Sequence, residues 1–101
     1  MITKAIFATL VAKQGMEEEV EEFLRGAKPL VEKELGTVTW YAIKLGNLRY
    51  GIFDTFYDET GLQTHLHGKI AEALKAESPR LFSATPTIES YDVIANTGGS
   101  T

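Results

Sequence analysis

Two histidines, His65 and His67, lie in the stretch THLHGK and are the only histidines in the chain. An imidazole can bind a metal ion or accept a proton near neutral pH, because its ordinary pKa is about 6.5. Residues two apart on a helix point about 200° away from each other, so these side chains diverge and cannot bind one metal ion. The chain also lacks cysteine. The sequence therefore predicts no metal site and leaves proton transfer open.

A predicted helix that begins after Asp58 carries both histidines at the margins of its apolar stripe. The members of this stripe are Leu62, Leu66, Ile70, Ala73 and Leu74. A histidine in that position either covers the edge of the core or faces a ligand pocket, and the sequence alone does not choose. His65 is the candidate base, whereas His67 is expected to be dispensable.

Asp54 interrupts the apolar strand sequence GIFDTF. A carboxylate buried without a partner costs free energy, so Asp54 either faces solvent, pairs with Arg49 or Lys44, or serves a site. In a site it would orient a pocket histidine or hold a substrate hydroxyl. We therefore name Asp54 beside His65 as a candidate catalytic residue.

Aromatic side chains are concentrated in two predicted strands, 37–45 and 48–57, that form a hairpin. The candidate pocket residues are Trp40, Tyr41, Tyr50, Phe53 and Phe56. Alternation along a strand places Trp40 and Tyr41 on opposite faces. These rings either form structural core and a surface for a second copy, or line an aromatic slot between sheet and helices for a flat ligand.

The apolar periodicity along the chain predicts the order strand, helix, strand, strand, helix, strand. The first strand covers 3–12, an acidic helix follows within 16–35, and the last strand covers 85–95. This order is typical of the α+β, ferredoxin-like βαββαβ protomer with an antiparallel four-stranded sheet. We expect one domain over residues 1–95 and a flexible tail over 96–101.

The amino-acid composition limits the binding partners and the cellular location that we expect for this protein. The 101-residue chain has a net charge of −4 and scattered basic residues, which disfavours nucleic acid. No apolar run approaches the roughly 18 residues that a membrane-spanning helix needs. Without cysteine, the reducing cytoplasm is the default location. Two helices over one sheet face would leave the other face bare, so we expect a homodimer.

The order and spacing of four short segments are similar to those of a known family. They are a first strand ending in AKQG before an acidic helix, then EKELGTVTWYAI, then FDTFYDETGLQTH, and a closing PTIESYDVI. Together they resemble the antibiotic biosynthesis monooxygenases, a family of dimeric α+β barrels that includes quinol monooxygenases. The resemblance spans about residues 3–95.

This resemblance implies oxygen insertion into a small aromatic or hydroquinone-like substrate without metal, flavin or other cofactor. It places Asp54 where the family often has glutamate, His65 at the family's helix histidine, and Trp40 at its strand aromatic. Phe56 stands where many members have tryptophan. The haem-degrading members need that tryptophan and an asparagine on the first strand, where this chain has Phe7, so haem breakdown is disfavoured.

Two other functions remain open. The dimer could bind a small apolar ligand or a partner without turnover, or it could be a cofactor-free isomerase or cyclase that consumes no oxygen. The sequence does not identify the substrate.

Overall fold

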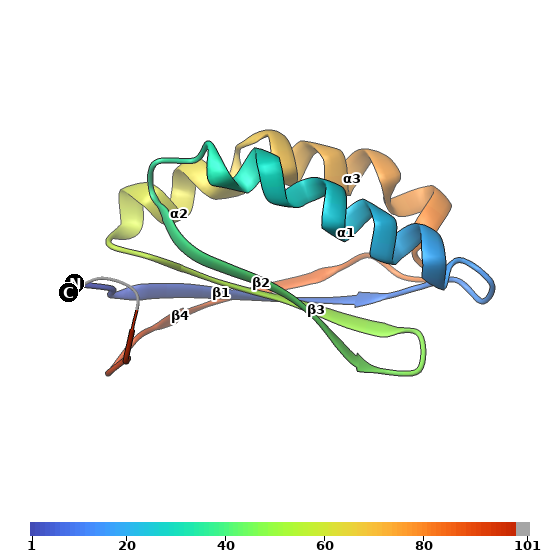
Figure 1. The fold of residues 1–101 in the computed structure, drawn as a ribbon, viewed down its shortest axis with the longest axis horizontal. Helices are drawn as coiled ribbons and strands as arrows, with labels where there is room; N and C mark the ends of the chain where they lie inside the picture. Colours follow the sequence, from blue (N-terminus) through green and yellow to red (C-terminus); the bar gives the residue numbers. More distant parts are fainter. Residues whose placement is uncertain (99–101) are drawn as a thin grey trace.

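An antiparallel four-stranded sheet lies under three helices in the computed structural model, which describes residues 1–98 (Figure 1). The elements in chain order are β1 Lys4–Val11, α1 Glu17–Glu32, β2 Thr37–Gly46, β3 Arg49–Phe56, α2 Glu59–Leu66, α3 Lys69–Leu81 and β4 Thr87–Asp92. All helices cover the same face of the sheet.

The strand order is β2-β3-β1-β4, and every neighbouring pair is antiparallel. With helices between β1 and β2 and between β3 and β4, this confirms the predicted ferredoxin-like protomer. Within residues 1–98, no helix is both long and apolar enough to cross a bilayer. Residues 99–101 of the expected flexible tail lie outside the described residues.

The core forms where β1 and β3 face α1. Alternate residues of β1 point toward the helices, and Ile6, Ala8 and Leu10 are all buried there. The buried residues of α1 are Val20, Leu24, Ala27 and Val31. Their spacings of four, three and four place them on one helix face, as the sequence predicted. Val20 and Leu24 pack on the inner strands, whereas Ala27 and Val31 pack against Ile70 of α3 and beside Trp40 of β2.

The second predicted helix is divided in two. Asp58 begins α2 as expected, because its Oδ1 accepts a hydrogen bond of 2.9 Å from the backbone N–H of Gly61. The prediction of one helix to Leu74 is wrong, because Gly68 is extended (φ −90°, ψ −174°) and α3 begins after it. The apolar spacing runs on across this break, so the sequence pattern concealed it.

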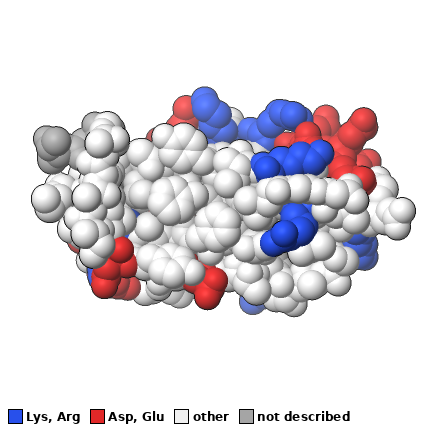
Figure 2. Space-filling model, turned by 90° about the horizontal axis from the view of Figure 1, so that it is seen from below, with Lys and Arg blue, Asp and Glu red and all other residues white. Residues whose placement is uncertain are grey.

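The sheet face opposite the helices carries few charged side chains over its middle (Figure 2). Tyr41 is 58% exposed, Tyr91 50%, Ile43 42% and Phe53 38%. Large apolar side chains gathered on one open face are typical of a surface that meets another protein chain.

Candidate active site

His65 on α2 is buried between two carboxylates. Its Nδ1 lies 2.6 Å from Oε1 of Glu34, and its Nε2 lies 2.8 Å from Oδ2 of Asp54. The side chains of His65 and Asp54 are 9% and 1% exposed. The contact to Glu34 is a hydrogen bond, whereas the contact to Asp54 is short but poorly oriented for one. The fold therefore brings together the two residues that the sequence singled out.

The position of Asp54 follows from strand alternation. Residue 54 pairs with Ile6 of β1 on one side and with Trp40 of β2 on the other, so it lies inside the sheet and not at its edge. Like Ile52 and Phe56, its side chain faces the helices and is buried.

The position of His65 is set by the start of α2. Asp58 caps this helix, and residue 65 follows about two turns later on the same side. Leu62 and His65, three residues apart, form the buried face that α2 turns toward the sheet.

Glu34 reaches the imidazole because glycines let the chain pass close by. A Cβ on Gly36 would lie 2.8 Å from Cα of Gly61, so the loop after α1 touches the backbone of α2. A Cβ on Gly68 would lie 3.0 Å from Oε2 of Glu34. The hydroxyl of Thr37 also donates a hydrogen bond of 2.8 Å to Oε1 of Glu34. These contacts fix the carboxylate beside Nδ1.

The charges of the site are strongly coupled. Burial raises the pKa of the Asp54 carboxyl above 3.8, and the nearby His65 offsets this only in part. Burial alone would lower the pKa of His65, but Asp54 and Glu34 together outweigh burial and hold that pKa above 6.5. Both groups therefore bind a proton more tightly in the folded chain than in the unfolded one.

The arrangement can store and move protons. Because a carboxylate only accepts, Nδ1 must donate to Glu34. Nε2 and Oδ2 of Asp54 lie 2.8 Å apart, so one of the two must carry a proton, because two lone pairs at that distance would repel. Neither oxygen of Asp54 has a hydrogen-bond donor in good geometry among residues 1–98, so this carboxylate can accept from a bound hydroxyl.

The same residues are not arranged as a metal site. Glu34 and Asp54 contact opposite nitrogens of the His65 ring and so do not converge on one point. Across the described part of the chain, no group of three or more His, Asp or Glu side chains could hold a metal ion.

Asp54 and His65 border a small cavity of about 40 Å³ between the sheet and α2–α3. Its other walls are mainly apolar side chains from the strands and helices, and they include Trp40. A water molecule needs roughly 10–15 Å³, whereas a cavity that holds benzene is about 150 Å³. The cavity can therefore take water or a diatomic gas, but an aromatic ring needs the walls to move.

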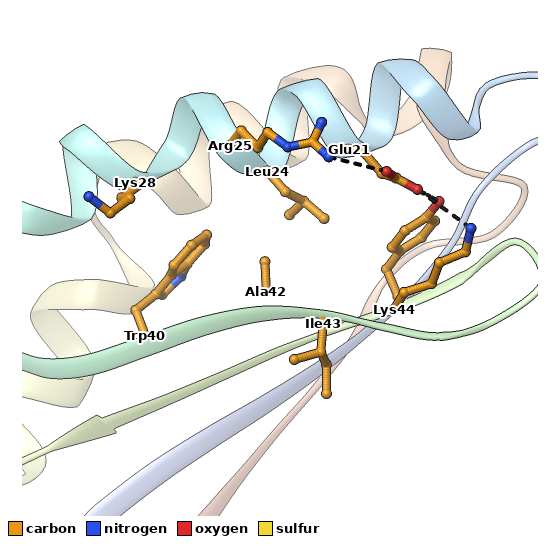
Figure 3. Close-up of a pocket in the computed structure, with 9 residues that line it drawn as sticks. Glu21, Leu24, Arg25, Lys28, Trp40, Ala42, Ile43 and Lys44 are labelled. Atoms are coloured by element: carbon orange, nitrogen blue, oxygen red, sulfur yellow. Dashed lines mark hydrogen bonds and ion pairs between the residues drawn. The ribbon is translucent and has the colours of Figure 1, made fainter. Parts of the chain in front are cut away.

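A larger groove of about 300 Å³ lies between α1 and β2 (Figure 3). Trp40, Ala42 and Leu24 form its apolar surface. Tyr50 also lines it and donates a hydrogen bond of 2.6 Å from its hydroxyl to Glu21. Burial and this carboxylate raise the pKa of Tyr50 to about 12, so the phenol stays protonated at neutral pH.

Trp40 lines both the groove and the cavity. Its indole Nε1 is buried and has no hydrogen-bond partner among residues 1–98. Because Nε1 has no partner, only packing holds the indole in place. Leaving such a buried donor unpaired costs about 1–3 kcal/mol.

The five aromatics predicted to line one pocket do not do so within one chain. Trp40 and Tyr50 line the groove, but Tyr41 and Phe53 lie on the opposite, uncovered sheet face. Phe56 is fully buried behind His65, with ring centroids 5.3 Å apart. Within one chain the groove therefore holds two of the five candidate pocket aromatics, because alternation divides the rest between faces.

Two more residues bear on the sequence predictions: His67, expected to be dispensable, and Glu34, which the sequence analysis did not name. His67 is exposed, and its Nδ1 lies 2.9 Å from the carbonyl oxygen of Gln63 on its own helix. Glu34 was not named as a site residue, although it stands two residues before Gly36 in the segment EKELGTVTWYAI. The glutamate–x–glycine spacing of Glu34 and Gly36 was the sequence feature that could have pointed to Glu34.

No protein-family model matches this chain, and no curated protein matches its sequence. Among solved structures, NE2512, a protein of unknown function from Nitrosomonas europaea, is 42% identical with a TM-score of 0.96. The match covers 100% of this chain and 98% of that one. The chain belongs to the same family as NE2512.

Two candidate antibiotic biosynthesis monooxygenases share the fold of this family. The one from Nitrosomonas europaea is 11% identical with a TM-score of 0.83, covering 95% of this chain and 94% of that one. The one from Caulobacter crescentus is 18% identical with a TM-score of 0.80, covering 93% and 92%. The resemblance to antibiotic biosynthesis monooxygenases is confirmed at the level of the fold.

Proposed function

We propose that this protein is a cofactor-independent monooxygenase that oxidises a small aromatic of the hydroquinone class with molecular oxygen. The observation that carries the proposal is the buried Glu34–His65–Asp54 group beside a small apolar cavity. The fold shared with candidate antibiotic biosynthesis monooxygenases adds support.

The reaction begins when a hydroquinone hydroxyl donates its proton to the His65–Asp54 pair. Both groups have raised pKa values, which brings proton uptake closer to neutral pH and improves a general base. The apolar walls disfavour charge in the cavity, so the resulting anion has a strong tendency to pass an electron to oxygen. Asp54 is well suited to receive the hydroxyl because its oxygens lack donors.

The later steps balance without an external reductant. The semiquinone radical and superoxide combine, a ring carbon forms a bond to oxygen, and a proton returned from the His65–Asp54 pair completes a hydroperoxide. The ring C–H bond and the O–O bond then break, and water leaves. The product is a hydroxyquinone, so the substrate supplies all four electrons that reduce oxygen. A simple phenol oxidised to a catechol supplies only two, which favours a hydroquinone.

Access to the site requires Trp40 to move. The groove is large enough for a single ring, whereas the cavity beside Asp54 is not. The unpaired Nε1 of Trp40 favours such a turn, because the indole would exchange a buried orphan donor for a new partner. In this scheme the ring enters from the groove and oxygen occupies the cavity.

We also propose that the protein acts as a homodimer through its uncovered sheet face. Tyr41, Phe53 and Tyr91 on that face are 58%, 38% and 50% exposed, and large exposed apolar side chains on one face are typical of a surface that meets another chain. A second copy offers the same apolar surface, as a two-fold symmetric contact requires.

Oxygen uptake tests the proposed function. Chelator-treated protein is given a panel of hydroquinones, with His65→Ala and His67→Ala variants alongside. Uptake should fall by about 100-fold or more in His65→Ala, because a general base contributes about 10²–10⁴. His67→Ala is the matched control and should keep full activity, since His67 lies exposed on the same helix end. Absence of uptake with every hydroquinone would favour a binding module, and product formed without oxygen an isomerase or cyclase.

A further inference from the structure

We infer that the groove between α1 and β2 binds a small aromatic ligand that carries a carboxylate. This deepens the proposed function and rests on it, because it makes the substrate an acidic hydroquinone. The decisive feature is the combination of an apolar surface around Trp40 with a cationic rim of Arg25, Lys28 and Lys44 (Figure 3).

The rim has an excess of positive charge in a chain whose net charge is −4. Among the residues that line the groove, three are cations and only Glu21 is an anion. Arg25 lies 3.4 Å and Lys44 3.6 Å from the Glu21 carboxylate, so two cations share one acid. Lys28 pairs with Glu32 one turn along α1, at 2.9 Å and in solvent, a contact of little net strength.

The two cations of α1 lie at different places along the rim of the groove. Arg25 and Lys28 are three residues apart, but the Arg25 guanidinium extends toward Glu21, whereas the Lys28 ammonium extends the other way, above Trp40 (Figure 3). A guanidinium can bind both oxygens of a carboxylate, and the ammonium adds a second donor group. A carboxylate at the rim over Trp40 would therefore lie beside Lys28, and the long Arg25 side chain is the next cation along the helix.

The volume of the groove limits the ligand. About 300 Å³ is at the lower end of the range for small-molecule sites, which suits one ring with short substituents. The Tyr50 hydroxyl donates to Glu21, and Arg25 and Lys44 pair with the same carboxylate, so the positive charge at this end of the groove is already partly balanced. The ligand's acid is thus expected toward Lys28, with Arg25 as the second donor.

Binding is measured by titration calorimetry under nitrogen, so that no turnover can occur. The probes are gentisate, a hydroquinone with a ring carboxylate, and gentisamide, its neutral counterpart. Gentisate should bind about tenfold more tightly. Arg25→Gln and Lys28→Gln should each weaken gentisate about two- to fivefold and leave gentisamide unchanged, as expected for partly exposed ion pairs.

Two further variants sharpen the test. Glu21→Gln should strengthen gentisate binding, because it releases Arg25 from a competing carboxylate. Lys75→Gln, an exposed position on α3 outside the groove, removes the same charge and should have no effect. Equal affinity for the two probes, or equal weakening by Lys75→Gln, would overturn the inference. If gentisate binds under nitrogen but no hydroquinone causes oxygen uptake, the proposed function is overturned. If only neutral hydroquinones cause oxygen uptake, the inference that the substrate carries an acid is overturned.

Discussion

Replacing His65 by alanine should destabilise the fold strongly, and the loss should depend on pH. Among residues 1–98, His65 is the only side chain that lowers the pKa of Asp54, which is 1% exposed. Removing one partner of a buried ion pair costs about 3–5 kcal/mol, because the other charge is left uncompensated. We expect a loss of free energy of unfolding in that range near neutral pH.

The pH dependence follows from the two raised pKa values. Without His65, folded Asp54 must keep its proton, whereas the unfolded chain releases it above pH 3.8, so the variant loses stability as the pH rises from there. The wild type keeps the contribution of protonated His65 below pH 6.5 and loses it as the pH rises through the higher folded pKa. The cost of His65→Ala should therefore be small near pH 4, largest near neutrality, and smaller again in alkali.

Urea unfolding followed by far-ultraviolet circular dichroism, at one protein concentration and several pH values, measures this cost. Adding Asp54→Asn to His65→Ala should recover much of the loss, because it removes the stranded charge. His67→Ala is the control and should change stability by no more than about 0.5 kcal/mol. A cost for His65→Ala that is equal at pH 4 and pH 7, or no recovery in the double variant, would refute the account of the buried charges.

Four further substitutions test the fold and the assembly. Gly36→Ala should lower the free energy of unfolding in urea by about 1–3 kcal/mol, because its Cβ would lie 2.8 Å from the Gly61 backbone. Gly26→Ala is its control: a Cβ there has nothing within 4 Å and should stabilise α1 by about 0.5–1 kcal/mol. Equal effects of the two substitutions would contradict the close approach of Gly36 to Gly61. Phe53→Glu should convert a dimer to a folded monomer in sedimentation velocity, and an unchanged dimer would move the interface away from this sheet face. Asp58→Ala should lower stability by about 1 kcal/mol through loss of the α2 cap, measured in the same urea series, and no change would mean that the cap is dispensable.

The order of the elements was predictable because periodicity is a local property. The spacing of Val20, Leu24, Ala27 and Val31 determines which face of α1 is buried, whatever lies beneath it. The break at Gly68 was missed because the apolar spacing continues through it.

The pairing of His65 with Asp54 could be proposed but not established from the sequence. It depends on where α2 crosses β3, which is set by the Asp58 cap and by the contact between Gly36 and Gly61. Glu34 comes from a loop that is distant in sequence from His65, and no local pattern reports that contact.

The division of the aromatics was partly predicted, because alternation placed Trp40 and Tyr41 on opposite faces. Phe53 and Phe56 are three residues apart on one strand, so they point to opposite faces. Which face meets the helices, and which side of β3 carries Trp40, depends on strand register, which the structure supplies.

The most direct test of the proposed activity is mass analysis of the product formed from a hydroquinone under oxygen gas enriched in the heavy isotope. The proposal predicts a hydroxyquinone with one heavy oxygen atom on the ring, formed by chelator-treated wild type and lost in His65→Ala. A product without heavy oxygen, or one formed equally well without oxygen gas, would contradict a monooxygenase.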